Sequence, residues 1–222
     1  MRYQGSKSGD CFRTSTRLLI ATSALLLFSY PSLAQNQSGR RRVGDPPVVP
    51  HGTIRAIYDS FETPQSLKEL VKAADVIVDG RVQSIFPGRL RQVNDPTSVE
   101  TDALFAVDRV LKGTPELLRS LVITQMGGKY GDVEVVVEHL TRLNQGDQHI
   151  LFLNYDRRTI VPPYPRTDGN FTIVGAWIGN FKLQDNAVKW VGPPTAETFK
   201  KFERDTAETF VAQILAEVSA AQ

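Results

Sequence analysis

The stretch from Ala73 to Gly113 reads AADVIVDGRVQSIFPGRLRQVNDPTSVETDALFAVDRVLKG, and it decides the fold. Every second residue from Val76 to Val82 is valine or glycine, and the residues between are mostly polar, which is typical of a half-buried β-strand. The same period of two returns from Val99 to Val107. The segment between, Phe86–Thr97, holds the turn formers Pro-Gly and Asn-Asp-Pro. The stretch therefore predicts a long β-hairpin.

The sequence after this hairpin predicts enough strands to close a small barrel. The alternation slips at Asp108–Arg109 and resumes at Val110, which indicates a β-bulge of the kind that bends a strand into a barrel. The run Ile150–Leu153 is apolar without a break, which predicts burial on both faces. The further strands that we predict are Leu121–Met126, Val133–Glu138, His149–Tyr155, Phe171–Trp177, Phe181–Gln184 and Ala187–Val191.

Two helices are predicted to flank the strands. Thr63-Pro64 has the pattern of a helix start, and an apolar stripe follows over Leu67–Ala74. The spacing over His51–Phe61 fits either one helical face or a loose chain packed on the barrel. A C-terminal amphipathic helix is predicted from Thr195. Its apolar stripe comprises Phe199, Phe202, Phe210, Ile214, Leu215 and Val218.

Several of these residues carry a resemblance to a known family. The run Ala-Asp-Val-Ile-Val, then Gly80-Arg81-Val82, then Phe105–Gly113 resembles the netrin-like barrel of tissue inhibitors of metalloproteinases. Together with Gly146–Leu153, it is also similar to a set of secreted bacterial proteins. The resemblance implies a mainly β fold: a five-stranded OB-type, netrin-like barrel with added C-terminal strands, a short helix before the first strand and a C-terminal helix. Protease inhibition does not carry over, because in that family it depends on an N-terminal cysteine, whereas the mature chain expected here starts at Gln35 and has no cysteine.

The first 34 residues have the pattern of a signal peptide. Basic residues precede a short apolar run, Leu18–Tyr30, and Ser32-Leu33-Ala34 supplies the small residues that a signal peptidase needs. An uncleaved membrane anchor is the alternative, but this run is too short to span about 30 Å of hydrocarbon. We expect cleavage between Ala34 and Gln35, and a secreted or periplasmic protein with no transmembrane segment once the signal is removed.

The rest of the chain divides into a tether and one domain. Residues 35–62 lack periodicity and hold several prolines and the triplet Arg40–Arg42, which predicts a flexible tether. The triplet either is solvated or holds an anionic polymer of the cell envelope. Residues 63–222 are predicted to form a single barrel domain with the C-terminal helix.

Composition excludes some functions. The only cysteine, Cys11, precedes the expected cleavage site, so no disulfide or thiol chemistry is available to the mature chain. The leader contains four of the 26 basic and one of the 24 acidic residues, so the net charge falls from +2 to −1 when it is removed. Global charge thus gives no reason to expect a nucleic-acid partner.

No cofactor or metal site is predicted. The mature chain offers only His51, His139 and His149 as histidine ligands, without the close spacing that zinc requires, so surface or hydrogen-bonded histidines are expected. No G-x-S-x-G nucleophile elbow is present. The glycine-rich segment Gly127–Gly131 either connects two strands or cradles a phosphate through its amides.

Carboxylates and loop arginines are the remaining candidates for function. The strand carboxylates are expected on a solvated face, although a hydrolytic pair among them stays open. They are Asp79, Glu100, Asp102, Asp108, Glu134 and Glu138. Arginines occupy the hairpin loop and the later loop after Tyr155, two loops that can flank the ligand face of an OB-type barrel. The predicted ligand rim comprises Arg89, Arg91, Arg157, Arg158, Lys129 and Tyr130.

These observations favour a secreted, non-enzymatic binding domain. Its expected partner is a protein or an anionic envelope polymer, and solvated loop charges are the alternative account of the arginines. The alternative function is an extracytoplasmic hydrolase that uses strand carboxylates. No catalytic residue is assigned, because the spacing singles out no pair.

Overall fold

The computed structural model describes residues 52–56, 63–92, 95, 97–114, 119–138, 140–156, 170–192 and 197–221. All of them belong to one of the chain's two units, Pro46–Gln222. The predicted signal peptide with Ala34 and Gln35, and the rim residues Arg157 and Arg158, lie outside the described residues.

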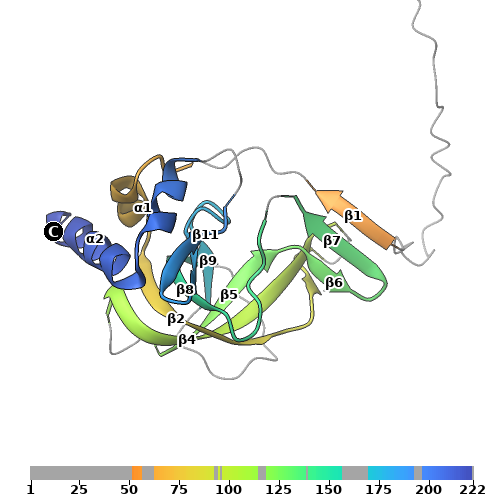
Figure 1. Ribbon diagram of the computed structural model, residues 1–222. Helices are drawn as coiled ribbons and strands as arrows, with labels where there is room; N and C mark the ends of the chain where they lie inside the picture. Colours follow the sequence, from red (N-terminus) through yellow and green to blue (C-terminus); the bar gives the residue numbers. More distant parts are fainter. Residues whose placement is uncertain are drawn as a thin grey trace, which may run out of the picture. The chain divides into compact units, whose positions relative to one another are not determined.

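The described residues form a mainly β structure with short helices (Figure 1). The helices are α1 (Leu67–Ala73), the 3-10 helix η2 (Glu197–Arg204) and α2 (Ala207–Ala220). The strands are β1 (Gly52–Ala56), β2 (Val76–Ile85), β3 (Arg89–Leu90), β4 (Val99–Lys112), β5 (Ser120–Met126), β6 (Gly128–Tyr130), β7 (Val133–Val137), β8 (Gln148–Tyr155), β9 (Asn170–Ile173), β10 (Asn180–Gln184) and β11 (Ala187–Trp190).

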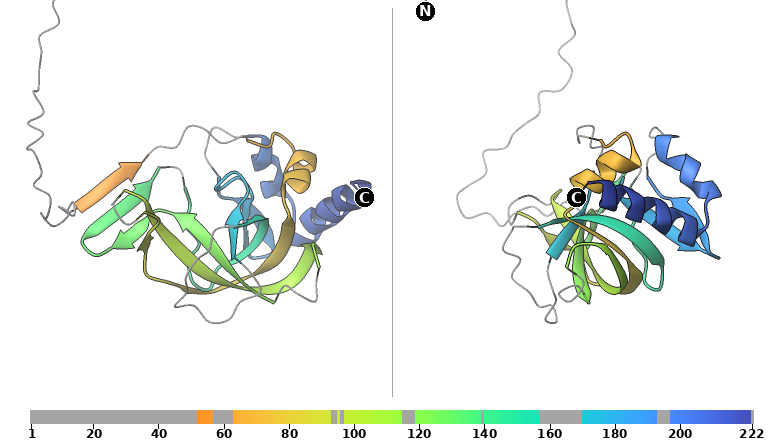
Figure 2. Two further views of the ribbon diagram at one scale, coloured as in Figure 1. Left: turned by 180° about the vertical axis from the view of Figure 1, so that it is seen from behind. Right: turned by 90° about the vertical axis from the view of Figure 1, so that its left-hand side faces the viewer.

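Five strands close a barrel in the order β8-β2-β4-β5-β9, and β9 returns to β8. All neighbours in this ring are antiparallel except β5 and β9, which are parallel. The predicted hairpin forms β2 and β4, the longest pair in the ring, and both strands curve strongly around the barrel (Figure 2). The predicted five-stranded OB-type barrel is therefore confirmed.

One strand of the ring differs from the sequence prediction. Val133–Glu138 was expected in the barrel, but β7 lies in a separate three-stranded sheet of order β1-β7-β6. Phe171–Trp177 was expected as an added strand, but this part of the chain forms β9 (Asn170–Ile173), which closes the barrel. Both segments alternate apolar and polar residues, and alternation identifies the buried face of a strand but not its neighbour. Extra strands outside the ring are β10 and β11, as predicted.

The predicted bulge is present at Asp108. In the pairing of β2 with β4, Asp79 faces Arg109 and Gly80 faces Val107, so Asp108 has no partner across the pair. Gly80 stands where the two strands approach closely, because a Cβ there would overlap the backbone oxygen of Ala106 and lie 2.7 Å from the Phe105 ring. The bulge and the glycine together allow the tight curvature of the barrel wall.

Two apolar clusters share the barrel wall. The interior cluster contains Val78, Phe105 and Phe171, all fully buried. Along β8, Leu151 and Leu153 belong to this interior, whereas Ile150 and Phe152 belong to an outer cluster beneath the helices. The predicted burial of Ile150–Leu153 on both faces is therefore confirmed.

The helices cover the outer cluster at the opposite end of the barrel from the three-stranded sheet (Figures 1 and 2). The short helix begins later than Thr63-Pro64, because Ser66 caps it by accepting from the N–H of Glu69 at 3.2 Å. The predicted C-terminal helix is divided: η2 ends at Arg204, and Thr206 caps α2. Of the predicted apolar stripe, Leu215 is 43% exposed, because it lies on the outer side of α2.

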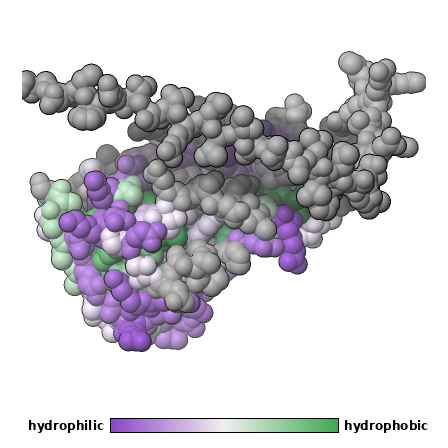
Figure 3. Space-filling view, turned by 90° about the horizontal axis from the view of Figure 1, so that it is seen from above, coloured by the Kyte–Doolittle hydropathy of each residue, from purple (hydrophilic) through white to green (hydrophobic). Residues whose placement is uncertain are grey.

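The three-stranded sheet contains two features that the sequence did not predict. β1 pairs in parallel with β7, although residues 51–61 were expected as a helical face or a loose chain. Within Gly127–Gly131, expected as a loop, Gly128–Tyr130 forms β6. A Cβ at Gly128 would overlap the Thr101 hydroxyl, so glycine allows this close approach to β4. Hydrophilic side chains cover much of the described face in Figure 3, and hydrophobic side chains show between them.

Candidate functional site

A row of polar side chains crosses the outside of the barrel. Asp102 of β4 faces Thr124 of β5, Thr124 faces Thr172 of β9, and Thr172 faces Asn154 of β8. The residues next to them along the strands point inward, because successive side chains alternate between the two faces of a strand. For β5 and β9 these inward neighbours are Ile123 and Phe171, both in the interior cluster. The barrel register therefore places four polar residues in line on one outer surface.

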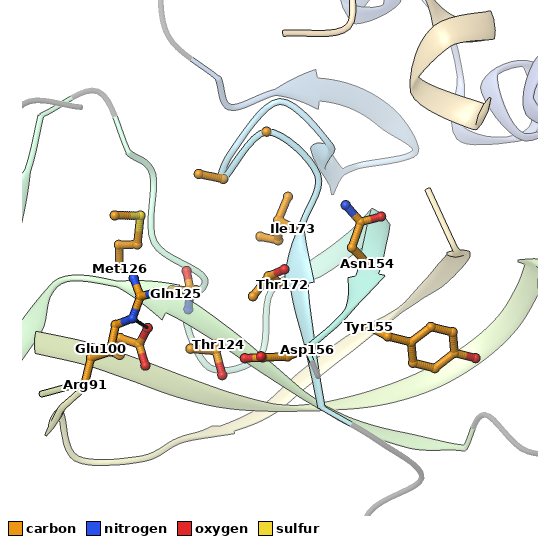
Figure 4. A pocket seen from close by; sticks show the side chains of 12 residues that line it. Arg91, Glu100, Thr124, Gln125, Met126, Asn154, Tyr155, Asp156, Thr172 and Ile173 are labelled. Carbon is orange, nitrogen blue, oxygen red and sulfur yellow. Dashed lines mark ion pairs between the residues drawn. The ribbon is translucent and has the colours of Figure 1, made fainter. Parts of the chain in front are cut away.

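A groove of about 360 Å³ lies over three residues of this row, Thr124, Thr172 and Asn154 (Figure 4). In this view Arg91 and Glu100 lie at one end, Thr124, Asp156 and Thr172 lie between, and the ring of Tyr155 points away at the other end. The polar residues that line the groove are Arg91, Glu100, Thr124, Gln125, Asn154, Asp156 and Thr172. Hydroxyl, amide and charged groups together suit a ligand that forms hydrogen bonds. We call this feature the outer groove.

Arg89 forms ion pairs with two carboxylates at the base of the outer groove. Its Nε lies 2.8 Å from Oδ2 of Asp102, and its Nη1 lies 3.0 Å from Oε2 of Glu100. The hydroxyl of Thr124 donates to Oδ1 of Asp102 at 2.6 Å. Asp102 is completely buried, so these hydrogen bonds replace the water that it would bind if exposed. Arg89 was predicted as part of a ligand rim, but its guanidinium holds two carboxylates of the barrel instead.

Arg91 is the rim residue that does line the outer groove. Its side chain is 53% exposed, and its Nε lies 3.9 Å from Oε1 of Glu100. A smaller cavity of about 120 Å³ adjoins the groove and shares Arg91, Glu100 and Met126 with it. Arg91 therefore lines both cavities, and its guanidinium can donate hydrogen bonds to a ligand in either one.

The second arginine-bearing loop begins at the same groove. Asp156 lines the groove, and its N–H donates to the carbonyl oxygen of Asn170 at 2.9 Å, so both ends of the loop meet there. Arg157 and Arg158 follow Asp156 in the sequence and lie outside the described residues. Arg91 and Asp156, the first residue of the second loop, therefore line the same groove.

The two remaining rim residues lie elsewhere. Lys129 and Tyr130 are on β6, and neither lines the outer groove. β6 does run close to the residue before β3. A Cβ at Gly88 would lie 2.4 Å from the backbone oxygen of Lys129 and would overlap it. Tyr130 is 43% exposed. The structure therefore brings only Arg91 of the described rim residues to the groove with its charge turned outward.

The strand carboxylates correct the expectation of a solvated face. Asp79, Glu100 and Asp102 are all buried. Asp79 accepts from Arg109 Nη2 at 2.6 Å and from Gln148 Nε2 at 3.1 Å. Period-two alternation identified these residues as polar positions on the strands. It could not show that they are buried, because the arginines that bind them come from other strands. Asp108 is exposed, as expected, and the side chain of Glu134 is 46% exposed.

His149 is a buried, hydrogen-bonded histidine, which is one of the two environments expected for the histidines. It is 1% exposed, and its Nδ1 lies 2.7 Å from Oδ1 of Asn180. The amide oxygen can only accept, so Nδ1 carries the proton and Nε2 has none while the ring is neutral. Nε2 lies 3.9 Å from Oδ2 of Asp147, which Lys182 holds at 2.8 Å. Burial lowers the pKa of His149 to about 4.

Because the pKa of His149 is lowered, we expect the protein to lose stability in mild acid. An unfolded histidine binds a proton below about pH 6.5, but folded His149 binds one only near its pKa of about 4. The unfolded state therefore takes up more protons between these values, and the free energy of unfolding should fall by about 3 kcal/mol as pH drops through this window. Urea unfolding at pH 7 and pH 4.5 measures the loss. His149→Gln should show a shallower decline, and an equal decline would contradict this origin.

Comparison with protein-family models gives no match to this chain. No protein in a collection of curated sequences matches it either. Among the residues that the structure describes, no group of three or more His, Cys, Asp or Glu side chains could hold a metal ion. No helix within the described ranges is long and apolar enough to cross a membrane.

Proposed function

We propose that this protein is a non-enzymatic binding domain that is exported from the cytoplasm and binds an anionic partner at the outer groove. The observation that carries the proposal is the position of Arg91, half-exposed between two hollows, at the point where the second arginine-bearing loop begins. A guanidinium presents several donors in one plane and suits carboxylate and phosphate groups. The partner is a protein or an envelope polymer that carries such groups.

Three further features support this proposal. Arg89 already binds the buried carboxylates Glu100 and Asp102, so one of their two negative charges is offset within the protein. The threonines and amides of the polar row add neutral hydrogen-bonding groups beside Arg91, which suits a polar ligand. Export is supported by the basic start, the short apolar run and the Ser-Leu-Ala sequence that ends at position 34.

The alternative function is hydrolysis of envelope material by strand carboxylates. The specific feature in its favour is Glu100, a carboxylate that both lines the outer groove and lies beside Asp102 on the same face of β4. Incubation of the purified protein with peptidoglycan, glycans and esters tests this alternative. Turnover that is lost in Glu100→Gln would replace the binding proposal.

Replacement of Arg91 tests the binding proposal directly. The protein is immobilised, exposed to an envelope extract and washed at increasing salt, and the retained material is identified by mass spectrometry. Arg91→Ser should weaken retention about fivefold at low salt, because one exposed charge contact contributes about 1 kcal/mol, and salt should abolish the difference. Arg204→Ser removes an exposed arginine of η2 and is the matched control. Equal retention of both variants would contradict a site at the outer groove.

A further inference from the structure

β1 is attached to the rest of the fold through one neighbour. Among the described elements, only β7 makes extensive contact with it, in a parallel register from Gly52 opposite Val133 to Ala56 opposite Val137. The ladder continues at both ends, where the N–H of Gly52 donates to Asp132 and the N–H of Glu138 donates to the carbonyl oxygen of Ala56. The strand therefore completes a sheet edge and does not belong to the barrel.

Little apolar surface holds β1 in place. Gly52, Thr53 and Arg55 are exposed, and only Ile54 and Ala56 are partly buried against the valines of the small sheet. The ion pair of Arg55 with Glu138 has a 3.9 Å separation and a largely exposed arginine, so it adds little. A segment with so few buried contacts opens at a small fraction of the free energy that global unfolding requires.

Opening of β1 would uncover a strand edge that is well suited to accept another strand. β7 already pairs with β6 on its other side, and three of its five residues, Val133, Val135 and Val137, are buried. Its free edge would then carry unpaired N–H and C=O groups beside an apolar surface. Such edges pair readily with an extended segment of another chain.

We propose that β1 exchanges between two copies of this chain, so that the β1 of each copy pairs with the β7 of the other. The segment that fits the β7 edge is known in this case, because β1 itself matches it in register and in the placement of Ile54 and Ala56. A β1 from a second copy makes the same contacts. The exchange therefore loses only the high effective concentration that β1 has when it is on the same chain as β7. Ten residues separate Ala56 from Leu67, which can span about 30 Å when extended.

The exchange should depend on protein concentration. A strand on its own chain acts at an effective concentration of about a millimolar, so the exchanged dimer grows as the protein concentration approaches that range. In a reciprocal exchange two copies each give one strand to the other, so the product is a closed dimer. The interaction is separate from the outer groove, so its failure would leave the proposed function unaffected.

An engineered disulfide distinguishes the two arrangements. Thr53 and Glu134 face each other across the β1–β7 pair, and the neighbouring apolar residues point to the other face. The full chain carrying Cys11→Ser, Thr53→Cys and Glu134→Cys is held at low or at high concentration, oxidised, and separated on a non-reducing gel. We expect a cross-link within one chain at low concentration and covalent dimers in increasing proportion at high concentration.

Two controls make the result specific. Thr53→Cys with Val136→Cys is a pair on the same face but two residues out of register, and it should cross-link poorly. Adding Ile54→Ser to the matched pair should reduce both products, whereas adding Arg55→Ser, at an exposed position, should not. Cross-links within one chain at every concentration would overturn the exchange. No cross-link at all, or equal dimers from the mismatched pair, would overturn it as well.

Discussion

Replacement of Phe105 with alanine should destabilise the protein by about 3–5 kcal/mol, the range for a large aromatic side chain removed from a packed core. Phe105 is fully buried in the barrel interior and pairs across the wall with Val82. Its ring also fills the space above Gly80, where no side chain is present. The cavity left by alanine therefore could not be closed from that side of the barrel. Chemical denaturation monitored by circular dichroism measures the change.

The matched control for Phe105 is its neighbour on β4. Leu104 points to the outside of the barrel and is only partly buried, so Leu104→Ala should cost about 1 kcal/mol. A barrel with a packed interior requires a clear difference between the two variants. Similar, small losses in both would mean that Phe105 does not face a closed interior.

Replacement of Arg89 with methionine should destabilise the protein by about 3 kcal/mol. The change keeps most of the side-chain length but removes the guanidinium that binds the buried carboxylates of Glu100 and Asp102. Removal of one partner of a buried ion pair costs about 3–5 kcal/mol because a charge stays in a poorly solvated position. We take the lower end because Arg89 itself is 28% exposed.

Arg91→Met is the matched control for this ion-pair network. Arg91 follows β3, two residues after Arg89, and is half-exposed, so its loss should change the free energy of unfolding by less than about 1 kcal/mol. The same two variants separate stability from binding, since Arg91 is the one proposed to contact the partner. An Arg89→Met protein as stable as Arg91→Met would contradict the structural role of Arg89.

Local sequence patterns predicted the parts of the fold that local physics determines. Alternation along β2 and β4 identified the hairpin, the slip at Asp108 identified the bulge, and the unbroken apolar run in β8 identified burial on both faces. Each of these depends on which face of a strand is buried, and side-chain chemistry reports that directly. The amphipathic spacing near the C-terminus also predicted buried phenylalanines, although the helix is divided at Thr206.

Pairings between distant segments could not be predicted in this way. β7 and β9 have similar alternation, and only the packed structure shows that β9 joins β5 to β8. The polar row of the outer groove depends on the same pairings, so its four residues could not be recognised as neighbours. Arg89 gave a misleading signal because an arginine in a loop resembles a solvated one until Glu100 and Asp102 are seen beside it.

The central claim is that β9 closes the barrel and thereby builds the outer groove, and a nuclear magnetic resonance experiment tests it most directly. The account predicts cross-strand nuclear Overhauser effects on both sides of β9, between Ile123 and Phe171 and between Leu153 and Ile173. It also predicts slow hydrogen exchange for the N–H of Val174, which donates to the carbonyl oxygen of Phe152. Contacts on one side of β9 only, or on neither, would describe an open sheet and would contradict the account.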